Sequence, residues 1–551
     1  METDTPTDKE VEWQFDAQDL RVVLRWIETF VEGTDGVTLT SGGTINQVDT
    51  YVDTADRRLD RAGYSVRLRR TRRSAAEATL KSLEGPAPDA LRIRLEVAEP
   101  LEGDDPVAVA QASGPVGRRV RALVGPRKLV PLFDLHTRRR VFPLAVAGAP
   151  SGELLLDETT IRDPGGGILS RLRRVEVEVP ESAVGAVGKL VETLQRACGL
   201  QPAVLTKYEA ALAARGYRRV EPQTFGSAAI TADDTIGEVA LAILRRQFAT
   251  LLAKEPGTRL GDDIEELHDM RVASRRLRAA IALFGEFLPA EATRLRTELA
   301  WVGQTIGAVR DLDVQLEQLD EWLSLLPESD RAPLAKLRAV LEEERSGART
   351  EMLAALDSRR YEGFVRRFGR VLRSRSGTRR PAALAVAPDL VERRHRSLRK
   401  ARRKAVRSGD PTAYHRLRIT AKRFRYALEF LSEVYPGETK ALVKRTVVLQ
   451  DLLGAYQDAG VATARLRDLA TQRGAELGPE AVFAMGEVAE RYRASMDDVL
   501  GRVPKAYAKL VGRGWKTLRK RMEAARPPAP PSPRVAAAPS PGAVEAAVLT
   551  P

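Results

Sequence analysis

Two segments of the sequence place a histidine and three cations on one side of a helix. At 100° per residue, four side chains of HRLRITAKRFRYALEFL fall within roughly 80° of one another, and they are His415, Arg418, Lys422 and Arg425. The earlier segment HDMRVASRRLRAAIALF has the same spacing, His-x2-Arg-x3-(Arg/Lys)-x2-Arg, in the residues His268, Arg271, Arg275 and Arg278. A row of stacked cations is suited to binding a polyanion.

The alternative interpretation of each row is an ordinary solvated face, because most amphipathic helices carry their charges toward water. Two cations about 6 Å apart repel by roughly 0.7 kcal/mol in water and more strongly near a protein surface. We expect the rows to be neutralised by a bound anion rather than by acidic neighbours on the same helix.

The two segments belong to a longer internal repeat. Three pairs of residues lie 147 positions apart, namely His268 and His415, Gly307 and Gly454, and Asp311 and Asp458. Three matches at one offset indicate the tandem duplication of a helical unit. Asp311, Asp313 and Asp458 could bind a cation, but we expect them to hold neighbouring arginines in place.

Charged and apolar residues alternate in short runs near the N-terminus, which is typical of β-strands. Residues two apart share one face of a strand, and the charged sets are Glu10 and Glu12; Arg67 and Arg69; Arg92, Arg94 and Glu96; and Glu176 and Glu178. Periodicity alone favours an arrangement in which these charges face water and the apolar sets fill a barrel. In the alternative, the apolar sets pack outward against helices and the charges line a wet lumen.

Seven such runs predict an antiparallel sheet or barrel, and they span 10–15, 47–53, 64–71, 77–83, 90–98, 153–161 and 173–179. Helical patterns interrupt them near 16–31, 104–124 and 182–199, and from about 236 the period changes to 3.6. We therefore predict an α+β protein of two domains. The first predicted domain is an antiparallel β-barrel with flanking helices over 1–217, and a linker follows over 218–235. The second is an all-α duplicated helical bundle over 236–523, with repeats of about 236–375 and 385–523 and a break at 374–390. A Pro/Ala-rich tail over 524–551 is predicted to be disordered.

The composition limits the functional classes. The 551 residues carry a net charge of +14, but residues 1–230 hold 32 Lys and Arg against 33 Asp and Glu, so the excess lies in the second half. The one cysteine, Cys198, excludes an intramolecular disulfide framework and is typical of the reducing cytoplasm. The N-terminus is too polar for a signal peptide, and no apolar run is long enough to predict a membrane span.

The ordered set of N-terminal motifs resembles the CYTH family, the triphosphate tunnel metalloenzymes. Glu-Val-Glu at 10–12 resembles the start of the family's ExExK signature, and TYVDTADRRLDRAGYSVRLRRT resembles its second and third strands. The later pieces follow in the family's order, and they are LKSLEG, RIRLEV, LLLDE, VEVEV and TKYEAAL. The match covers about 200 residues. In that family the strands close into a tunnel whose inward charges bind a triphosphate and one or two divalent metal ions, so the resemblance favours the lumen arrangement.

The resemblance also implies roles for single residues. The cations expected on phosphate oxygens are Arg67, Arg69, Lys81, Arg94, Arg139 and Lys207. The expected ligands of Mg²⁺ or Mn²⁺, which prefer carboxylate oxygens, are Glu10, Glu12, Glu96, Asp157, Glu176 and Glu178. Glu10 and Glu12, with Lys81 and Lys207, would be catalytic.

Two departures from the family's pattern weaken the expectation of turnover. Gln14 stands where the signature has its lysine, and Ala98 stands where the family's Arg-x-Glu-x-Glu strand has its second acid, with Glu99 out of register. The loss of a cation and a carboxylate can slow hydrolysis while leaving the binding of the anion intact.

The duplicated helical unit resembles the CHAD domain, an all-α module named for its histidines. Both halves match in order, through HDMRVASRRLR with GAVRDLDV and HRLRITAKRFRYALEFL with LQDLLGAYQDAG, over about 236–520. The resemblance implies inorganic polyphosphate bound by the two cationic rows. Nucleic acid is the weaker candidate because aromatic residues make up only 5% of the chain. A zinc site is disfavoured because the histidines of the rows stand among cations, and His136 and His395 receive no role.

Two hypotheses follow. In the first, the chain is a cytoplasmic, metal-dependent hydrolase of phosphoanhydride bonds that cleaves inorganic tripolyphosphate or a related triphosphate and also binds polyphosphate. In the second, it is a non-catalytic polyphosphate-binding or granule-associated protein whose tunnel only binds phosphate chains. Neither hypothesis involves a membrane, and Gln14 is the residue that separates them.

Overall fold

The computed structural model describes residues 9–30, 36–71, 75–83, 90–221, 223–325, 328–374 and 381–528. The predicted disordered tail lies outside these residues from 529 onward. The chain packs into two compact units, which are described separately: the first holds residues 1–226, 245–277 and 295–373, and the second holds 227–244, 278–294 and 374–551.

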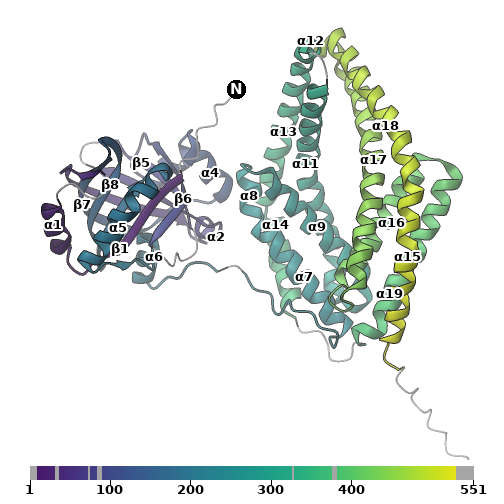
Figure 1. The fold of residues 1–551 in the computed structure, drawn as a ribbon, viewed down its shortest axis with the longest axis horizontal. Coiled ribbons are helices and arrows are strands. Elements are labelled where there is room, and N and C mark those ends of the chain that lie inside the picture. The colour runs from purple at the N-terminus through teal and green to yellow at the C-terminus, as the bar shows by residue number, and fades with distance from the viewer. Residues whose placement is uncertain are drawn as a thin grey trace, which may run out of the picture. The chain divides into compact units, whose positions relative to one another are not determined.

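Eight antiparallel strands close into a barrel at the N-terminal end of the first unit (Figure 1). In spatial order they are β1 (Lys9–Asp16), β6 (Leu91–Pro100), β5 (Glu77–Ser82), β4 (Tyr64–Thr71), β3 (Gly43–Thr54), β7 (Leu129–Val146), β8 (Ala149–Arg162) and β9 (Ile168–Val179), which pairs with β1. Two short strands extend this sheet, with β2 (Val37–Leu39) on β7 and β10 (Gln201–Pro202) on β1. The barrel prediction is confirmed.

The seven predicted runs coincide with strands, but the sequence did not predict β7. Its 18 residues include Pro131, Pro143 and three consecutive arginines, which interrupt the alternation. The strand nevertheless pairs along both edges, with β3 and with β8. Register shifts lie next to both prolines, between Tyr51 and Val52 of β3 and between Leu144 and Ala145 of β7, so the ladder accommodates the missing N–H groups by local irregularity.

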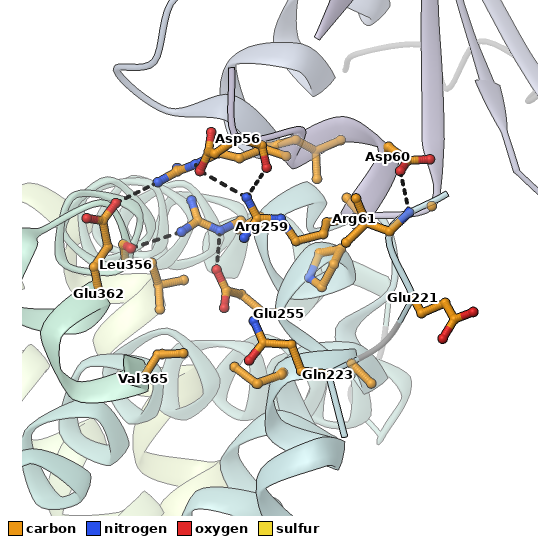
Figure 2. A pocket seen from close by; sticks show the side chains of 18 of the residues that line it. Asp56, Asp60, Arg61, Glu221, Gln223, Glu255, Arg259, Leu356, Glu362 and Val365 are labelled. Carbon is orange, nitrogen blue, oxygen red and sulfur yellow. Dashed lines mark hydrogen bonds and ion pairs between the residues drawn. The ribbon is translucent and has the colours of Figure 1, made fainter. Parts of the chain in front are cut away.

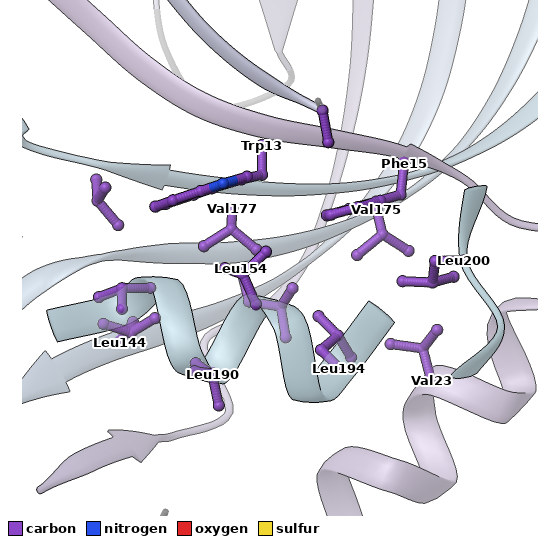
Figure 3. Packing of buried hydrophobic residues seen from close by; sticks show 14 of the residues in the cluster. Trp13, Phe15, Val23, Leu144, Leu154, Val175, Val177, Leu190, Leu194 and Leu200 are labelled. Carbon is purple, nitrogen blue, oxygen red and sulfur yellow. The ribbon is translucent and has the colours of Figure 1, made fainter. Parts of the chain in front are cut away.

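The apolar faces of β1 and β9 point outward, so the arrangement that periodicity favoured is wrong. Val11, Trp13 and Phe15 are buried in one cluster with alternate residues of β9 and with side chains of the flanking helices (Figure 3). Those helices are α1 (Leu20–Thr29) and α5 (Val184–Cys198). Because the helices supply the apolar partner on the outside, the charged face of each strand is left to line the interior.

The other helices of the barrel region are short. They are α2 (Arg58–Arg61), α3 (Pro106–Gln111), α4 (Pro115–Val124) and α6 (Lys207–Ala214). The start of α6 is fixed by a capping box, in which the Thr206 hydroxyl accepts the Glu209 N–H at 3.2 Å and the Glu209 carboxylate accepts the Thr206 N–H at 2.9 Å. Lys207 is thereby held at the first position of the helix.

From Ile236 onward the described chain is almost entirely helical. The helices before residue 374 are α7 (Ile236–Ala253), α8 (Glu255–Leu260), α9 (Ile264–Phe284), α10 (Ala290–Arg294), α11 (Arg296–Leu325), α12 (Glu328–Arg331), α13 (Ala335–Leu356) and α14 (Arg359–Arg373). Those after it are α15 (Ala383–Ser408), α16 (Pro411–Phe430), α17 (Glu438–Leu477), α18 (Pro479–Val511) and α19 (Arg513–Ala524). Within the second unit, α17 and α18 run side by side (Figure 1). No helix of the described residues combines the length and apolar character needed to cross a membrane.

Helix boundaries follow the offset of the repeat. The first residues of α7 and α15 lie 147 positions apart, as do those of α9 and α16, which agrees with the predicted duplication. The predicted break at 374–390 is shorter than expected, because α15 begins at Ala383 and carries Pro388 inside it.

Candidate functional site

The inward charges of the strands line a cavity of about 150 Å³ inside the barrel. Its lining includes eleven of the twelve predicted lumen residues, which are Glu10, Glu12, Arg67, Arg69, Lys81, Arg94, Glu96, Arg139, Glu176, Glu178 and Lys207. The twelfth, Asp157, is fully buried and bound to two of them. The lumen arrangement implied by the resemblance is therefore the one observed.

Three carboxylates meet where β1 pairs with β9. Glu12 lies directly opposite Glu178 in the register, and carboxylate oxygens of Glu10, Glu12 and Glu178 all lie within 4.8 Å of one another. Burial, together with the neighbouring Glu176 and Glu10, raises the pKa of Glu178. Like charges held opposite each other are unfavourable unless a cation joins them, and oxygen donors at this spacing fit Mg²⁺ or Mn²⁺. Among the residues that the structure describes, these three form the cluster that could hold a metal ion.

The other predicted metal ligands lie outside this cluster and are paired with cations, as Glu10 and Glu12 also are. Glu96 accepts Lys81 at 3.0 Å and Arg67 at 3.3 Å. Although burial acts to raise it, these two cations lower the pKa of Glu96 to about 2. Lys81 also binds both oxygens of Glu10, at 2.6 and 2.7 Å, and Arg94 pairs with Glu12.

A second buried group joins β7, β8, β9 and α6. Arg139 donates to both oxygens of Asp157, at 2.9 and 2.7 Å, and to Glu176 at 3.0 Å. Lys207 donates to Glu176 at 2.7 Å and to Asp157. Burial would raise the pKa of Glu176, but Lys207 and Arg139 hold it well below its usual range. Glu176 is thus ionised, and both acids are already paired with protein cations.

The lumen is balanced in charge without any ligand. The cavity lining counts six carboxylates, Glu77 among them, against six cations. An anionic ligand cannot simply add to such a lumen, because each cation it takes leaves a carboxylate without its partner. Positive charge must enter with the anion.

Sequence reasoning missed Asp49 of β3. Arg69 donates to its two oxygens at 2.7 and 3.1 Å, and Arg67 lies 4.0 Å away. Against the effect of burial, Arg69 and Arg67 lower the pKa of Asp49 to about 2. The signal was present, because in QVDTYVD the alternation puts Asp49 on one face with Gln47 and Tyr51.

The two departures from the family's pattern have structural explanations. Gln14 is 3% exposed and donates its amide to Glu12 at 2.8 Å and to Glu176 at 3.3 Å. Glu99 points away from the lumen, where its carboxylate accepts the N–H groups of Val116 at 3.0 Å and Gly117 at 3.1 Å. Glu99 therefore satisfies backbone N–H donors at the start of α4. Its position out of the lumen register serves to stabilise this helix.

The cationic rows on the two repeat helices were predicted with one error. Arg271 of α9 pairs with Asp311 at 2.9 Å, and Arg418 of α16 pairs with Asp458 at 3.3 Å. Asp311 and Asp458 thus anchor arginines as predicted, and so does Asp313, which accepts Arg345 at 2.6 Å. The expectation that the rows lack acidic neighbours on their own helix is wrong at Arg425, which pairs with Glu429 at 3.2 Å.

The remaining members of the rows are partly or fully exposed, and the opposite faces of the two helices are buried. The exposed or half-buried members are His268, Arg275, Arg278, His415 and Lys422. His415 contacts Gln457 of α17 at 3.0 Å. Each row is therefore open to a ligand.

A larger pocket, of about 780 Å³, lies elsewhere in the first unit (Figure 2). None of the predicted site residues lines it. Arg259 pairs there with Glu255 at 2.8 Å and with Asp357 at 2.8 Å, and the Tyr361 hydroxyl donates to Glu255 at 2.7 Å. Its buried charges are joined in structural ion pairs, so we assign no chemistry to this pocket.

Comparisons with known proteins agree with this geometry. A model of the CYTH domain family matches residues 26–209, and a model of the CHAD domain family matches residues 242–467. The comparison with curated proteins gives no match.

Several solved structures are similar to parts of the chain. The CHAD domain from the plant Ricinus communis is 30% identical, with 53% of this chain and 97% of that chain covered and a TM-score of 0.44. PptA from Streptomyces chartreusis is 22% identical over 50% and 99% of the two chains, with a TM-score of 0.42. A putative adenylyl cyclase from Hippeastrum, HpAC1, described as having a dominant triphosphatase activity, is 20% identical over 39% and 98%, with a TM-score of 0.29. The chain contains a CYTH domain followed by a CHAD domain.

Proposed function

We propose that the barrel binds inorganic tripolyphosphate or a related triphosphate together with Mg²⁺ or Mn²⁺ and hydrolyses its terminal phosphoanhydride bond. The observation that carries this proposal is the lumen itself, in which six cations and a three-carboxylate cluster converge on one cavity. A lumen of this composition suits a compact, highly charged anion that brings its own divalent cation.

The first step is an exchange of partners. The guanidinium groups of Arg67, Arg94 and Arg139 leave their carboxylates and donate to phosphate oxygens, for which their planar fork is suited. Lys81 and Lys207 move less, because each stands between two carboxylates and offers three donors. The departure of Arg94 frees Glu12 and removes one of the two cations on Glu10, and the departure of Arg139 frees Glu178, so oxygens of this cluster become available as metal ligands.

A divalent cation held by those carboxylates would supply the Lewis acid that polarises a phosphoryl oxygen. The chain's own cations neutralise the charge that develops on the phosphoryl group and on the leaving pyrophosphate. Water attacks the terminal phosphorus, the bridging P–O bond breaks, and orthophosphate is released. Anion and metal ion are expected to bind cooperatively. The anion takes cations from the carboxylates, and the metal ion neutralises the carboxylates that are left unpaired.

Phosphate release from tripolyphosphate, ATP and long polyphosphate, each with Mg²⁺ or Mn²⁺, tests this proposal. We expect release from tripolyphosphate that depends on the metal and is lost in Glu10→Gln. No release with either metal, combined with tight and metal-dependent binding of tripolyphosphate, would leave the second candidate function.

That second candidate is a non-catalytic phosphate-chain receptor. Gln14 favours it, because a neutral amide stands where the resemblance expects a lysine. In this case the lumen holds the end of a chain and no bond is cleaved.

For the CHAD domain we propose binding of inorganic polyphosphate by the two cationic rows. The paired anchoring of Arg271 and Arg418 by aspartates supports it, since fixed guanidinium groups lose less freedom when a ligand binds. A cytoplasmic location remains a prediction that rests on the cysteine content of the sequence.

A further inference from the structure

Gln14 makes a third contact, on the side of its amide away from the carboxylates. While its Nε2 donates to Glu12 and Glu176, its Oε1 accepts from Nη1 of Arg174 at 3.4 Å. Carboxylates only accept and a guanidinium only donates, so these three neighbours together permit a single orientation of the amide.

Arg174 is placed for this contact by the register of β1 and β9. Gln14 pairs with Glu176 and Asp16 pairs with Arg174, so Gln14 and Arg174 are diagonal neighbours on the inward face. The Arg174 side chain is 2% exposed, pairs with Asp16 at 3.1 Å and donates to the Leu205 carbonyl at 2.9 Å. A permanently charged group is thus buried directly behind a neutral amide.

We propose that Arg174 is a positioning residue for the metal site, acting through Gln14. Its charge fixes the Gln14 amide with both N–H groups toward Glu12 and Glu176, and so holds Glu12 in place beside Glu10 and Glu178. This inference rests on the proposed function, because it concerns the carboxylates assigned there to the cation.

The pair of Gln14 and Arg174 differs from a lysine at position 14 in where the positive charge lies. A lysine would add a positive charge between Glu12 and Glu176, whereas the amide orients these carboxylates without adding charge. Arg174 and a lysine at position 14 are then alternatives, because both together would place two cations side by side in a buried site.

A double-mutant cycle on the full chain tests the inference, with wild type, Arg174→Gln, Gln14→Lys and the double variant. One measurement is the affinity for Mn²⁺ in the presence of tripolyphosphate. The other is hydrogen exchange of the β1 and β9 amides without ligand, read by mass spectrometry. We expect Arg174→Gln to weaken Mn²⁺ binding by roughly 10- to 100-fold, the range for partners that orient metal ligands. Gln14→Lys alone should lower the amide protection of β1 and β9. In the Arg174→Gln background, the same Gln14→Lys change should restore most of the Mn²⁺ affinity and most of the amide protection.

Arg92→Gln is the control for a merely structural effect. Arg92 is also buried and donates to the Ala203 carbonyl at 2.8 Å, on the loop that Arg174 holds through Leu205. Gln14→Lys should not rescue this variant. Additive effects in the ligand-free cycle, or equal rescue of Arg92→Gln, would overturn the inference. If the ligand-free cycle shows coupling but wild type binds neither Mn²⁺ nor tripolyphosphate, the proposed function fails while the role of Arg174 in orienting Gln14 stands.

Discussion

Replacing Glu178 by Gln should stabilise the ligand-free barrel while removing its affinity for a divalent cation. Glu178 lies opposite Glu12 and within 4.8 Å of both Glu10 and Glu12. The raised pKa of Glu178 shows that burial and its acidic neighbours outweigh the attraction of Arg139 at 3.9 Å. An amide of the same shape removes the repulsion and one metal ligand together.

The size of the effect follows from the distances. Two unit charges 4.8 Å apart repel by about 3.5 kcal/mol at an effective dielectric constant of 20. Arg139 offsets part of this, and the Glu178 side chain is 33% exposed, so solvent screens the rest. We expect the opening free energy of β1 and β9 to rise by about 1–2 kcal/mol, which corresponds to a 5- to 30-fold gain in amide protection.

Hydrogen exchange of the full chain without ligand measures the gain, and titration calorimetry with Mn²⁺ and tripolyphosphate measures the loss, which should be at least about 10-fold in affinity. Glu77→Gln is the matched control, because Glu77 lines the same cavity from β5 but lies outside the three-carboxylate cluster. Lower protection in Glu178→Gln, or unchanged Mn²⁺ affinity, would refute the reasoning.

Two further predictions concern the helical part. His395 stacks on Trp515 at 3.8 Å with no hydrogen-bond partner for its ring nitrogens among the described residues, and burial lowers its pKa from 6.5 to about 4. Between these two pH values the unfolded chain therefore binds a proton at His395 and the folded chain does not. The free energy of unfolding should fall by up to about 3 kcal/mol as the pH drops from 6.5 to 4. His395→Leu should abolish that dependence in thermal unfolding, and an unchanged pH profile would contradict the assignment. For long polyphosphate, Arg275→Ala or Lys422→Ala should each lower the slope of log affinity against log salt by about one. Arg276→Ala and Arg423→Ala, on the flanks of the rows, should leave the slope unchanged, and equal effects at row and flank would rule out the proposed binding surface.

The alternation in the N-terminal sequence predicted seven strands of the barrel but could not say which face was inward. That choice is tertiary, because it depends on α1 and α5 covering the outside of the sheet with apolar side chains. Two prolines and three adjacent arginines concealed β7. The helical rows and the duplication followed from spacing alone, because the period of a helix fixes which residues share a face.

Most lumen charges could be predicted from residue type and spacing, but their partners could not. Asp49 and Arg174 lie at positions that fit the period-2 alternation of their strands, so extending that pattern along each strand would have predicted them. The separation of Glu10, Glu12 and Glu178 from Glu96, Glu176 and Asp157 depends on which strands are neighbours. No pattern along a single strand carries that information.

If both proposals hold, the charge-balanced lumen and the exposed rows should respond differently to ionic strength. The cations of the exposed rows are screened by ions from solution, and a polyanion that displaces those ions gains entropy that salt abolishes. The cations of the lumen have carboxylates as their counterions, covalently attached and unable to leave. Binding there releases little to the solvent, so its affinity should respond to divalent cation and hardly to monovalent salt. Rising salt would then detach a long polymer from the helices while a short triphosphate stays in the barrel, which makes ionic strength a selector of chain length within one polypeptide.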